Sequence, residues 1–559
     1  MSYLSIRKRG DCFNIYAMTS GWDKEAKKRT KTQTFIGSFK NGRCSFNEHA
    51  HDHADLLSKS DYGKYYWQWK ECEAVAKDPT DNLIRMSVVE TADDRNAGIG
   101  LLLDKVCEAT GLAADVKEVF GERLGRLVLT ASYCLASGLE MPLNRIPQWC
   151  RDQVLPWTEA FDSDDLMEVL DKVDASSILQ FQGLWAKRFA KEKAVSLDIT
   201  SVSSYGRGIA DVTRGYNRDR ENLPQINLLM IVSQEAKLPL WYEQLPGTIS
   251  DSTTIKDTIR TLLQLKGCPR NIVLDRGFAS SENISCLLAN QVKFTMGIPL
   301  NRFTTVRDEV DAACRSNEFC NPRAYGQMYE YHGRYFTQGV TRLKMIDGHR
   351  VYLHMYFTEF YKSVASEKLM ETVALVEEKL RTGKELSTER EKEIAALCFE
   401  VKTTPKRGLQ VKSIDSAIAK LRDNDCGYFA IYSSATKDPW EALRLYKLRD
   451  GIEKRFDDMK NEEDLHRLRV HSAHNMRSRL FLQFLAQIMR CFILKRLQDR
   501  QAEAPKCTSV SDILWEISSL RQIRIENHQP FYKRPTKKQV EILKLFDIPM
   551  VGPRWKCMT

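Results

Sequence analysis

The strongest limit on the fold comes from a short apolar run that ends in an acid. The segment NIVLDRGF places three consecutive apolar residues, Ile272 to Leu274, directly before Asp275. Such a run is typical of a parallel strand buried on both faces, and the glycine after it indicates a turn before a helix from about Ser281. In an open α/β sheet, ligands bind at the carboxyl ends of the strands. The carboxylate of Asp275 is therefore expected at a ligand-binding edge.

A second acid lies on a strand of a different pattern. In AVSLDITSVSSYG, the apolar residues Val195, Leu197 and Ile199 alternate with polar ones. This is the period of a strand with one apolar and one polar face, and it places Asp198 and Thr200 on the polar face. A single aspartate at the end of a strand is more often a turn former or a helix cap than a catalytic group.

A third acid belongs to a Y-x2-R-x3-E-x6-K pattern in LYKLRDGIEKRFDDMK, formed by Tyr446, Arg449, Glu453 and Lys460. On one continuous helix, these positions fall within roughly a 60° arc of one face. A carboxylate among cations suits a metal ion that acts on a phosphate backbone. The plainer interpretation is a helix whose solvated face carries charges. A neighbouring arc is apolar and would anchor the helix, at Leu445, Leu448, Ile452, Phe456 and Met459.

Three acids, two on strands and one on a helix, can surround a pair of divalent ions. Without metal the carboxylates would repel one another, and at least one would tend to protonate. The arrangement therefore predicts a metal cofactor. Asp450 and Asp457 lie close to the same helix face and compete with Glu453 as the third acid.

With these motifs in place, the chain resembles the DDE transposases of bacterial insertion sequences, in the insertion-sequence-four-like group marked by a Tyr-Arg-Glu-Lys signature. The resemblance rests on LDITSVSSYG, on VLDRGF and on the complete signature, and it continues through the helical segment that follows, over about residues 190–500. It implies a ribonuclease-H-like catalytic core and dependence on Mg2+, with two ions and Mn2+ as a substitute. It also implies cleavage and joining of DNA strands at the inverted repeats of a mobile element.

The resemblance assigns roles to the six candidate residues. Asp198, Asp275 and Glu453 would be catalytic and would hold the metal ions. Tyr446, Arg449 and Lys460 would contact the DNA of the transposon end. The implied partners are double-stranded DNA, as terminal inverted repeats and as target, and a second copy of the chain in a homodimer. The implied location is the cytoplasm of a bacterium, in association with the nucleoid.

The spacing of the acids requires an inserted subdomain, because Glu453 lies 178 positions after Asp275 and a single crossover takes only some tens of residues. Residues 301–438 mix the strand-like stretches VYLHMYF, LCFEVKTT and CGYFAIYSS with a long charged helix from about Glu359 to Arg381, which predicts an α+β insertion. Tyr428 and Phe429 are candidate base-stacking residues, although aromatics in a short strand are more often core.

The predicted fold class is α/β, with a ribonuclease-H-like core interrupted by the α+β insertion and preceded by a helical domain. Stretches such as IGLLLDKVCEATGL have the helical period that predicts this domain. The expected organisation is a basic, strand-leaning N-terminal region (1–90), a helical DNA-end-binding or assembly domain (91–190), the first part of the core (191–300), the insertion (301–438), the C-terminal core helices (439–500) and a basic tail (501–559) with the short helix-like stretch QVEILKLF.

Charge and composition agree with a polyanionic partner. The net charge is +10, and residues 1–46 contain ten Lys or Arg against three acids, a pattern of a phosphate-binding patch or of a solvated face. No secretory signal is expected, and FLQFLAQIMRCFIL is too short and too polar to span a membrane, so it is predicted to be a buried helix. Fifteen cysteines without a CxxC pair indicate reduced thiols. His49, His51 and His53 have no second ligand cluster nearby and are not assigned to a metal site.

Two other functions compete with transposition. One is a metal-dependent nuclease on the same fold that cuts nucleic acid without joining strands. Intact acids do not separate these two activities, whereas a strand-transfer assay with a pre-cut end does. The other is a non-catalytic DNA-binding protein derived from a transposase, which the presence of all three acids and all four signature residues argues against.

Overall fold

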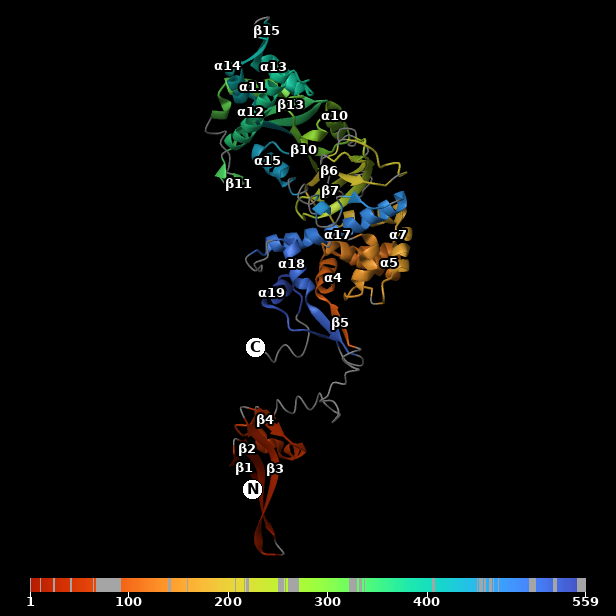
Figure 1. Ribbon diagram of the computed structural model, residues 1–559, viewed down its shortest axis with the longest axis vertical. Helices are drawn as coiled ribbons and strands as arrows, with labels where there is room; N and C mark the ends of the chain where they lie inside the picture. The colour runs from red at the N-terminus through yellow and green to blue at the C-terminus, as the bar shows by residue number, and fades with distance from the viewer. Residues whose placement is uncertain are drawn as a thin grey trace. The chain divides into compact units, whose positions relative to one another are not determined.

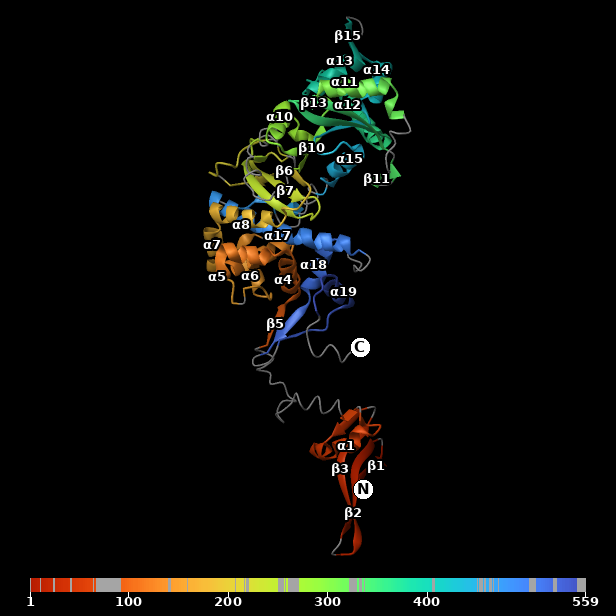
Figure 2. The same cartoon turned by 180° about the vertical axis from the view of Figure 1, so that it is seen from behind.

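Figures 1 and 2 show the computed structural model of the chain. The chain divides into two compact units, Met1–Asp93 with Arg524–Gln529 and Asp94–Ile523 with Pro530–Thr559. The structure describes residues 2–10, 12–23, 26–40, 43–63, 65–66, 92–138, 142–157, 159–206, 208–215, 217, 221–249, 256, 258–259, 271–320, 329–330, 334–335, 337–404, 408–449, 451, 456, 459–461, 465, 467–470, 472–501, 509–525 and 530–549.

The N-terminal unit is an antiparallel sheet with one face covered by short helices. Its strands follow one another in the order β1 (Ser2–Arg9), β2 (Cys12–Asp23), β3 (Lys28–Lys40) and β4 (Arg43–Phe46). The helices η1 (Glu48–His53) and α1 (Ala54–Ser58) pack on the face that presents Ile15 and Ala17. The strands predicted for the basic N-terminal region are therefore present.

A mixed sheet forms the centre of the second unit. Within the described residues it has nine strands, in the order β13-β14-β17-β10-β9-β6-β7-β8, with β18 beside β6. Strands β6, β9 and β10 run parallel, whereas β6, β7 and β8 are antiparallel neighbours. The bounds are β6 (Val195–Ser204), β7 (Gln225–Ser233), β8 (Pro239–Pro246), β9 (Asn271–Leu274), β10 (Lys293–Ile298), β13 (Thr337–Ile346), β14 (His349–Thr358), β17 (Tyr428–Ser433) and β18 (Arg467–Leu468).

The strand that carries Asp198 is buried more completely than its alternating pattern predicts. Leu197 and Ile199 pack in one core, as expected, but Ser196 and Thr200 on the predicted polar face are also buried. The reason is that layers cover both sides of the sheet, so even the polar positions of a central strand lie inside the molecule. Strand β9 and the helix after it, α10 (Ser281–Ala289), are present as predicted.

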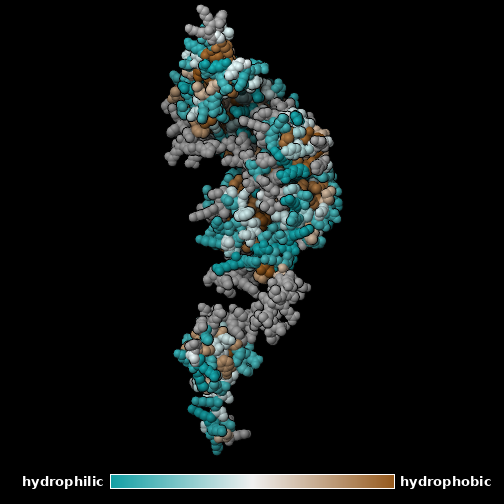
Figure 3. All heavy atoms as spheres, in the orientation of Figure 1, coloured by the Kyte–Doolittle hydropathy of each residue, from teal (hydrophilic) through white to brown (hydrophobic). Residues whose placement is uncertain are grey.

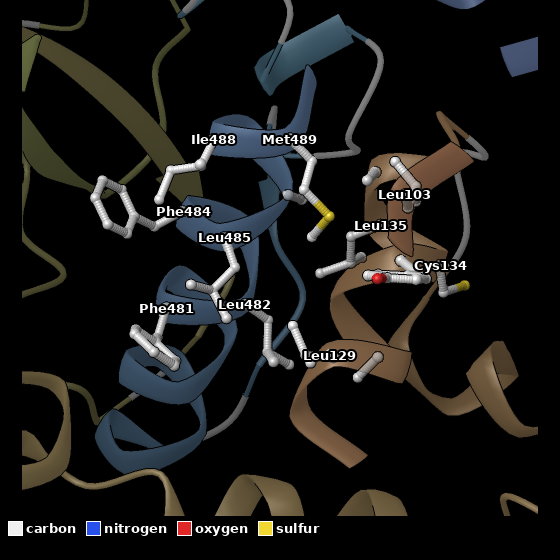
Figure 4. Close-up of a cluster of buried hydrophobic side chains, with 14 of the residues drawn as sticks. Leu103, Leu129, Cys134, Leu135, Phe481, Leu482, Phe484, Leu485, Ile488 and Met489 are labelled. Atoms are coloured by element: carbon white, nitrogen blue, oxygen red, sulfur yellow. The ribbon is translucent and has the colours of Figure 1, made fainter. Parts of the chain in front are cut away.

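Helices on one side of the sheet pack around a long central helix, α17. Figures 1 and 2 show α17 between the sheet and helices α4 and α5. Figure 4 shows Leu482 and Met489 of α17 on the side that faces Leu129 and Leu135 of α5. The buried helix predicted from FLQFLAQIMRCFIL is confirmed, and in the part of the chain that the structure describes no helix is long and apolar enough to cross a membrane. The bounds are α4 (Gly98–Thr110), α5 (Leu112–Ala136), α6 (Ile146–Cys150), α7 (Ser163–Lys172), α8 (Ala175–Lys187) and α17 (Ala473–Asp499).

The segment 301–438 has two parts. Its strands β13, β14 and β17 extend the central sheet, because β17 pairs with β10. The remainder has a small core of its own between α12 and α13, around Leu369, Val376 and Ile394. The predicted long charged helix is α12. The bounds are α11 (Thr304–Arg315), α12 (Glu359–Thr382), α13 (Glu389–Cys398), β15 (Phe399–Thr404), β16 (Gly408–Ser413) and α14 (Asp415–Asp425).

The two aromatics singled out in this segment pack against other rings. Tyr428 lies 4.8 Å from Phe357, and Phe429 is stacked on Tyr356 at 4.8 Å between ring centroids. Packing against neighbouring rings thus explains why aromatic residues occupy both positions.

The C-terminal residues complete the helical side of the second unit. Helix α18 (Val510–Ser518) contacts α4, and α19 (Lys537–Leu545), expected from QVEILKLF, contacts α18. The short strands β5 (Asp93–Asn96), β19 (Arg521–Arg524) and β20 (Phe531–Tyr532) form a separate small sheet.

Candidate active site

The backbone register brings Asp198 and Asp275 to the same level of the sheet. Leu197 of β6 is the parallel partner of Leu274 of β9, and each aspartate directly follows one of these two residues. Asp275 comes at the carboxyl end of its strand, where the chain turns into α10. Two strands far apart in sequence thus present neighbouring carboxylates.

A single guanidinium lies against both carboxylates. Nη1 of Arg449 is 3.2 Å from Oδ2 of Asp198, and Nη2 is 3.6 Å from Oδ1 of Asp275. The arginine is buried, with 6% of its surface exposed, whereas the side chain of Asp275 retains 32% exposure. Two acids that would repel each other are therefore held together by one buried cation.

Tyr446 adds a neutral donor to the same cluster. Its hydroxyl donates a hydrogen bond of 3.1 Å to Oδ1 of Asp275, and its ring lies 5.5 Å from the guanidinium carbon of Arg449. Burial, followed by the negative charge of Asp275, raises the pKa of the Tyr446 phenol. The hydroxyl therefore stays protonated and acts as a donor near neutral pH.

Helix α15 (Pro439–Leu448) holds Tyr446 and Arg449 against the sheet. Figure 1 shows α15 beside β10. Its N-terminus is capped by Asp438, whose carboxylate accepts from the amide of Trp440 at 3.0 Å. Near its C-terminus, Leu445 packs on Val273, and the amide of Gln234 donates to the Leu445 carbonyl at 2.9 Å. Both ends of the helix are thereby anchored.

Gly297 is a contributor to the site that the sequence analysis missed. A Cβ atom at this position of β10 would lie 2.8 Å from Cζ of Tyr446 and would also meet its hydroxyl. Only glycine therefore lets the tyrosine ring approach the strand. The available signal was a glycine inside a strand-like stretch, which often marks the close approach of another group.

The single helix predicted through the whole signature is not what the structure has. Helix α15 ends at Leu448, and Arg449 is its C-cap. Lys460 lies in a later helical stretch, and Leu448 is 41% exposed instead of joining the apolar stripe. Gly451, which disfavours a helix interior, follows the break closely.

The signature cations do not lie on a solvated helix face. Arg449 and Lys460 are each 6% exposed, so the plainer interpretation of a charged surface helix does not hold for them. Phe456 and Met459 are buried, as the apolar stripe predicts.

Glu453, with its competitors Asp450 and Asp457, lies outside the described residues. Among the residues that the structure does describe, no group of three His, Cys, Asp or Glu side chains is arranged to hold a metal ion. His49, His51 and His53 lie in the helix η1 rather than on one face of a strand. The donors that do converge, two carboxylates around one positive charge, are the oxygen ligands that hard divalent ions prefer.

Comparison with known proteins assigns a large part of the chain to a known family. Residues 190–489 match the family model described as "Transposase DDE domain". No curated protein matches the chain. A solved structure, "Cryo-EM structure of piggyBac transposase synaptic complex with hairpin DNA (SNHP)", is 11% identical with a TM-score of 0.31, over 75% of this chain and 76% of that chain.

The family match extends over more than half of the chain. It includes β6 and β9 with their aspartates, and α15 with Tyr446 and its cap Arg449. The chain belongs to the family of transposases with a DDE domain.

Proposed function

We propose that this chain binds the terminal inverted repeats of an insertion sequence and catalyses metal-dependent cleavage and transfer of DNA strands. The observation that carries the proposal is the meeting of Asp198 and Asp275, from adjacent parallel strands, at the guanidinium of Arg449. Ligands bind at the carboxyl ends of the strands in open α/β sheets, and paired carboxylates there can hold the metal ions that assist phosphate chemistry.

We infer that β8, β7, β6, β9 and β10 form a ribonuclease-H-like core. Three antiparallel strands next to two parallel ones support this assignment. The segment 301–438 is then an insertion between the second and third acids, and its separate small core supports that interpretation. The helices from α4 to α8 are the proposed DNA-end-binding or assembly domain.

Asp198 and Asp275, completed by Glu453, are the proposed ligands of two divalent ions, Mg2+ or Mn2+. Bound there, such ions activate the attacking oxygen and stabilise the leaving oxygen of the scissile phosphate. Carboxylate oxygens suit these ions, and the two aspartates already share one cation.

The proposal gives Arg449 one role in the metal-free site and another in a site that holds metal ions. In the structure its guanidinium neutralises the two aspartates. If Asp198 and Asp275 held divalent ions, the guanidinium of Arg449 would be available to a phosphate of the transposon end, for which its planar donors are suited. Tyr446 orients Asp275 through its hydroxyl, and Lys460 is a proposed second phosphate contact.

Membership in the Tyr-Arg-Glu-Lys group, action as a homodimer and a cytoplasmic, nucleoid-associated location follow from the resemblance of the sequence. These three properties are part of the proposal, but the observations that support it are those at the site.

A strand-transfer assay tests the proposal. The purified chain is given a pre-cut end with its terminal repeat, a supercoiled target and Mg2+. We expect joined products from the wild type, none from Asp198→Asn or Asp275→Asn, and wild-type yield from the control Asp308→Asn, an exposed acid on α11. Excess chelator should abolish the reaction. Metal-dependent cutting of intact ends without joining would instead assign the nuclease function.

A further inference from the structure

Among the described residues of the N-terminal unit, helices pack on one face of the sheet and leave the other face open. Side chains alternate along a strand, and directly opposite residues of antiparallel strands share a face. Ile15 and Ala17 of β2 point into the core beneath η1 and α1. Tyr16 and Trp22 therefore belong to the opposite, open face, together with their partners Phe35 and Arg29 of β3.

The open face combines exposed aromatic rings with cations. Tyr3, Trp22 and Phe35 are 46%, 62% and 41% exposed. Figure 3 shows both hydrophilic and hydrophobic residues on the visible surface of this unit. Arg29 lies directly opposite Trp22, and Lys31 belongs to the same face because it pairs with Ser20.

Negative charge is missing from this face within the described residues of β1, β2 and β3. Their one described acid, Asp23, pairs with Lys28 and belongs to the packed side of the hairpin. The open face thus suits a ligand that carries negative charge and presents flat apolar surfaces.

Unpaired nucleic acid has both properties. Its phosphates suit the cations, and its splayed bases stack on aromatic rings, whereas the bases of a duplex are already stacked on one another. A surface that bound only duplex backbone would need cations but would gain nothing from three exposed rings. Large exposed aromatics gathered on one face are otherwise unfavourable in a soluble protein.

We propose that the open face of the N-terminal sheet binds single-stranded DNA, with Trp22, Phe35 and Tyr3 stacking on unpaired bases and Arg29 and Lys31 holding the phosphates. The identification of the nucleic acid as DNA rests on the proposed function. The existence of the surface does not, because it is defined by the register and exposure of these strands.

Fluorescence anisotropy on the full chain tests this proposal. The probes are a labelled mixed-sequence single strand and the duplex of the same sequence, in chelator so that no cleavage takes place. We expect Trp22→Ala and Phe35→Ala each to weaken single-strand binding about tenfold and to change duplex binding by less than about twofold. Phe13→Ala is the matched aromatic control, because Phe13 is 38% exposed but lies on the packed side.

A second pair of variants tests the role of the cations. Lys31→Ala should weaken binding and reduce its salt dependence, whereas Lys28→Ala, the same change on the same strand but on the other side, should not. Thermal unfolding of each variant verifies that the sheet is intact.

Four results would overturn the proposal. They are an absence of single-strand binding by the wild type, wild-type affinity in the Trp22 and Phe35 variants, equal losses for single strand and duplex, and equal losses in the Lys31 and Lys28 variants. Binding to anionic vesicles that Trp22→Ala abolishes, with oligonucleotide binding unchanged, would assign the face to a lipid surface instead. Because strand transfer by the wild type is scored separately, failure here is distinguishable from failure of the proposed function.

Discussion

Arg449 lies where the carboxylates of two strands meet, and it is almost completely buried. A buried arginine is stable only if its charge is compensated, and the two aspartates need a cation in return. The same carboxylates are the proposed metal ligands. On this proposal, arginine and metal compete for one position, and the competition can be measured without any DNA.

We expect Arg449→Ala to lower the free energy of unfolding in chelator by about 3 kcal/mol, because it leaves two neighbouring carboxylates without their shared cation. Added Mg2+ should then raise the melting temperature of the variant more than that of the wild type, since the metal no longer displaces a guanidinium. Differential scanning calorimetry with and without Mg2+ provides the measurement. Arg444→Ala, an exposed arginine of the same helix, is the control. Equal Mg2+ shifts in wild type and variant would contradict the competition.

The close packing of the Tyr446 ring on Gly297 leads to a second prediction. Gly297→Ala should cost about 1–3 kcal/mol, because the new methyl group overlaps the ring of Tyr446. Combining it with Tyr446→Ala removes the overlap, so the double variant should be more stable than the sum of the two single effects. A double-mutant cycle from urea denaturation measures this coupling. Strict additivity would mean that ring and strand do not press on each other.

The third acid remains a prediction from the sequence, and a substitution decides it. Glu453→Gln should abolish strand cleavage while preserving binding of the transposon end, because it removes a charge that the metal ions require and keeps the shape. Asp457→Asn is the matched control in the same segment. Gel assays of cleavage and of end binding supply the two readouts. If Asp457→Asn is inactive and Glu453→Gln cleaves normally, Asp457 is the third ligand.

Strand β14 shows how an element can hold a buried titratable group in its neutral form. Nδ1 of His354 is 2.9 Å from the hydroxyl of Thr341, and Nε2 is 3.2 Å from the carbonyl oxygen of Thr436. A carbonyl only accepts, so Nε2 carries the proton and Nδ1 accepts from the threonine. Burial lowers the pKa of His354 to about 4, against smaller opposing effects of the hydrogen bond to the Thr436 carbonyl and of the charge of Asp438.

The low pKa of His354 predicts that the protein loses stability in acid. The folded-state pKa lies below the ordinary value of about 6.5, so the unfolded chain binds the proton more readily, and stability is lost as pH falls from about 6.5 towards 4. At pH 5 the loss from this group is about 2 kcal/mol. We expect His354→Gln to lose less stability than the wild type between pH 7 and pH 5, as measured by urea denaturation. His349→Gln, an exposed histidine of the same strand, should behave like the wild type.

The division into two units predicts that the N-terminal unit contributes to DNA binding by the whole molecule. Residues 1–46 carry ten cations against three acids, and they belong to the N-terminal unit. Removing residues 1–93 should leave the central sheet intact, as judged by circular dichroism, and should make the dependence of DNA affinity on salt less steep, because fewer counterions are released. An unchanged slope in salt titrations would exclude a contribution of this unit to phosphate binding.

Local patterns were sufficient for much of the architecture. The apolar run before Asp275, the turn and helix after it, the charged helix α12 and the buried helix α17 could all be read from sequence, because each depends on the period of neighbouring side chains. The same patterns nominated Asp198, Asp275, Tyr446 and Arg449 as candidates.

Other features depend on contacts between distant segments. The register of β6 against β9 sets the two aspartates side by side, and the packing of α15 on the sheet brings its C-cap Arg449 against them. Pairing of β17 with β10 joins part of the segment 301–438 to the central sheet. No local period encodes these relations, because hydrogen bonds and ion pairs between segments more than 150 residues apart form only when the whole sheet has assembled.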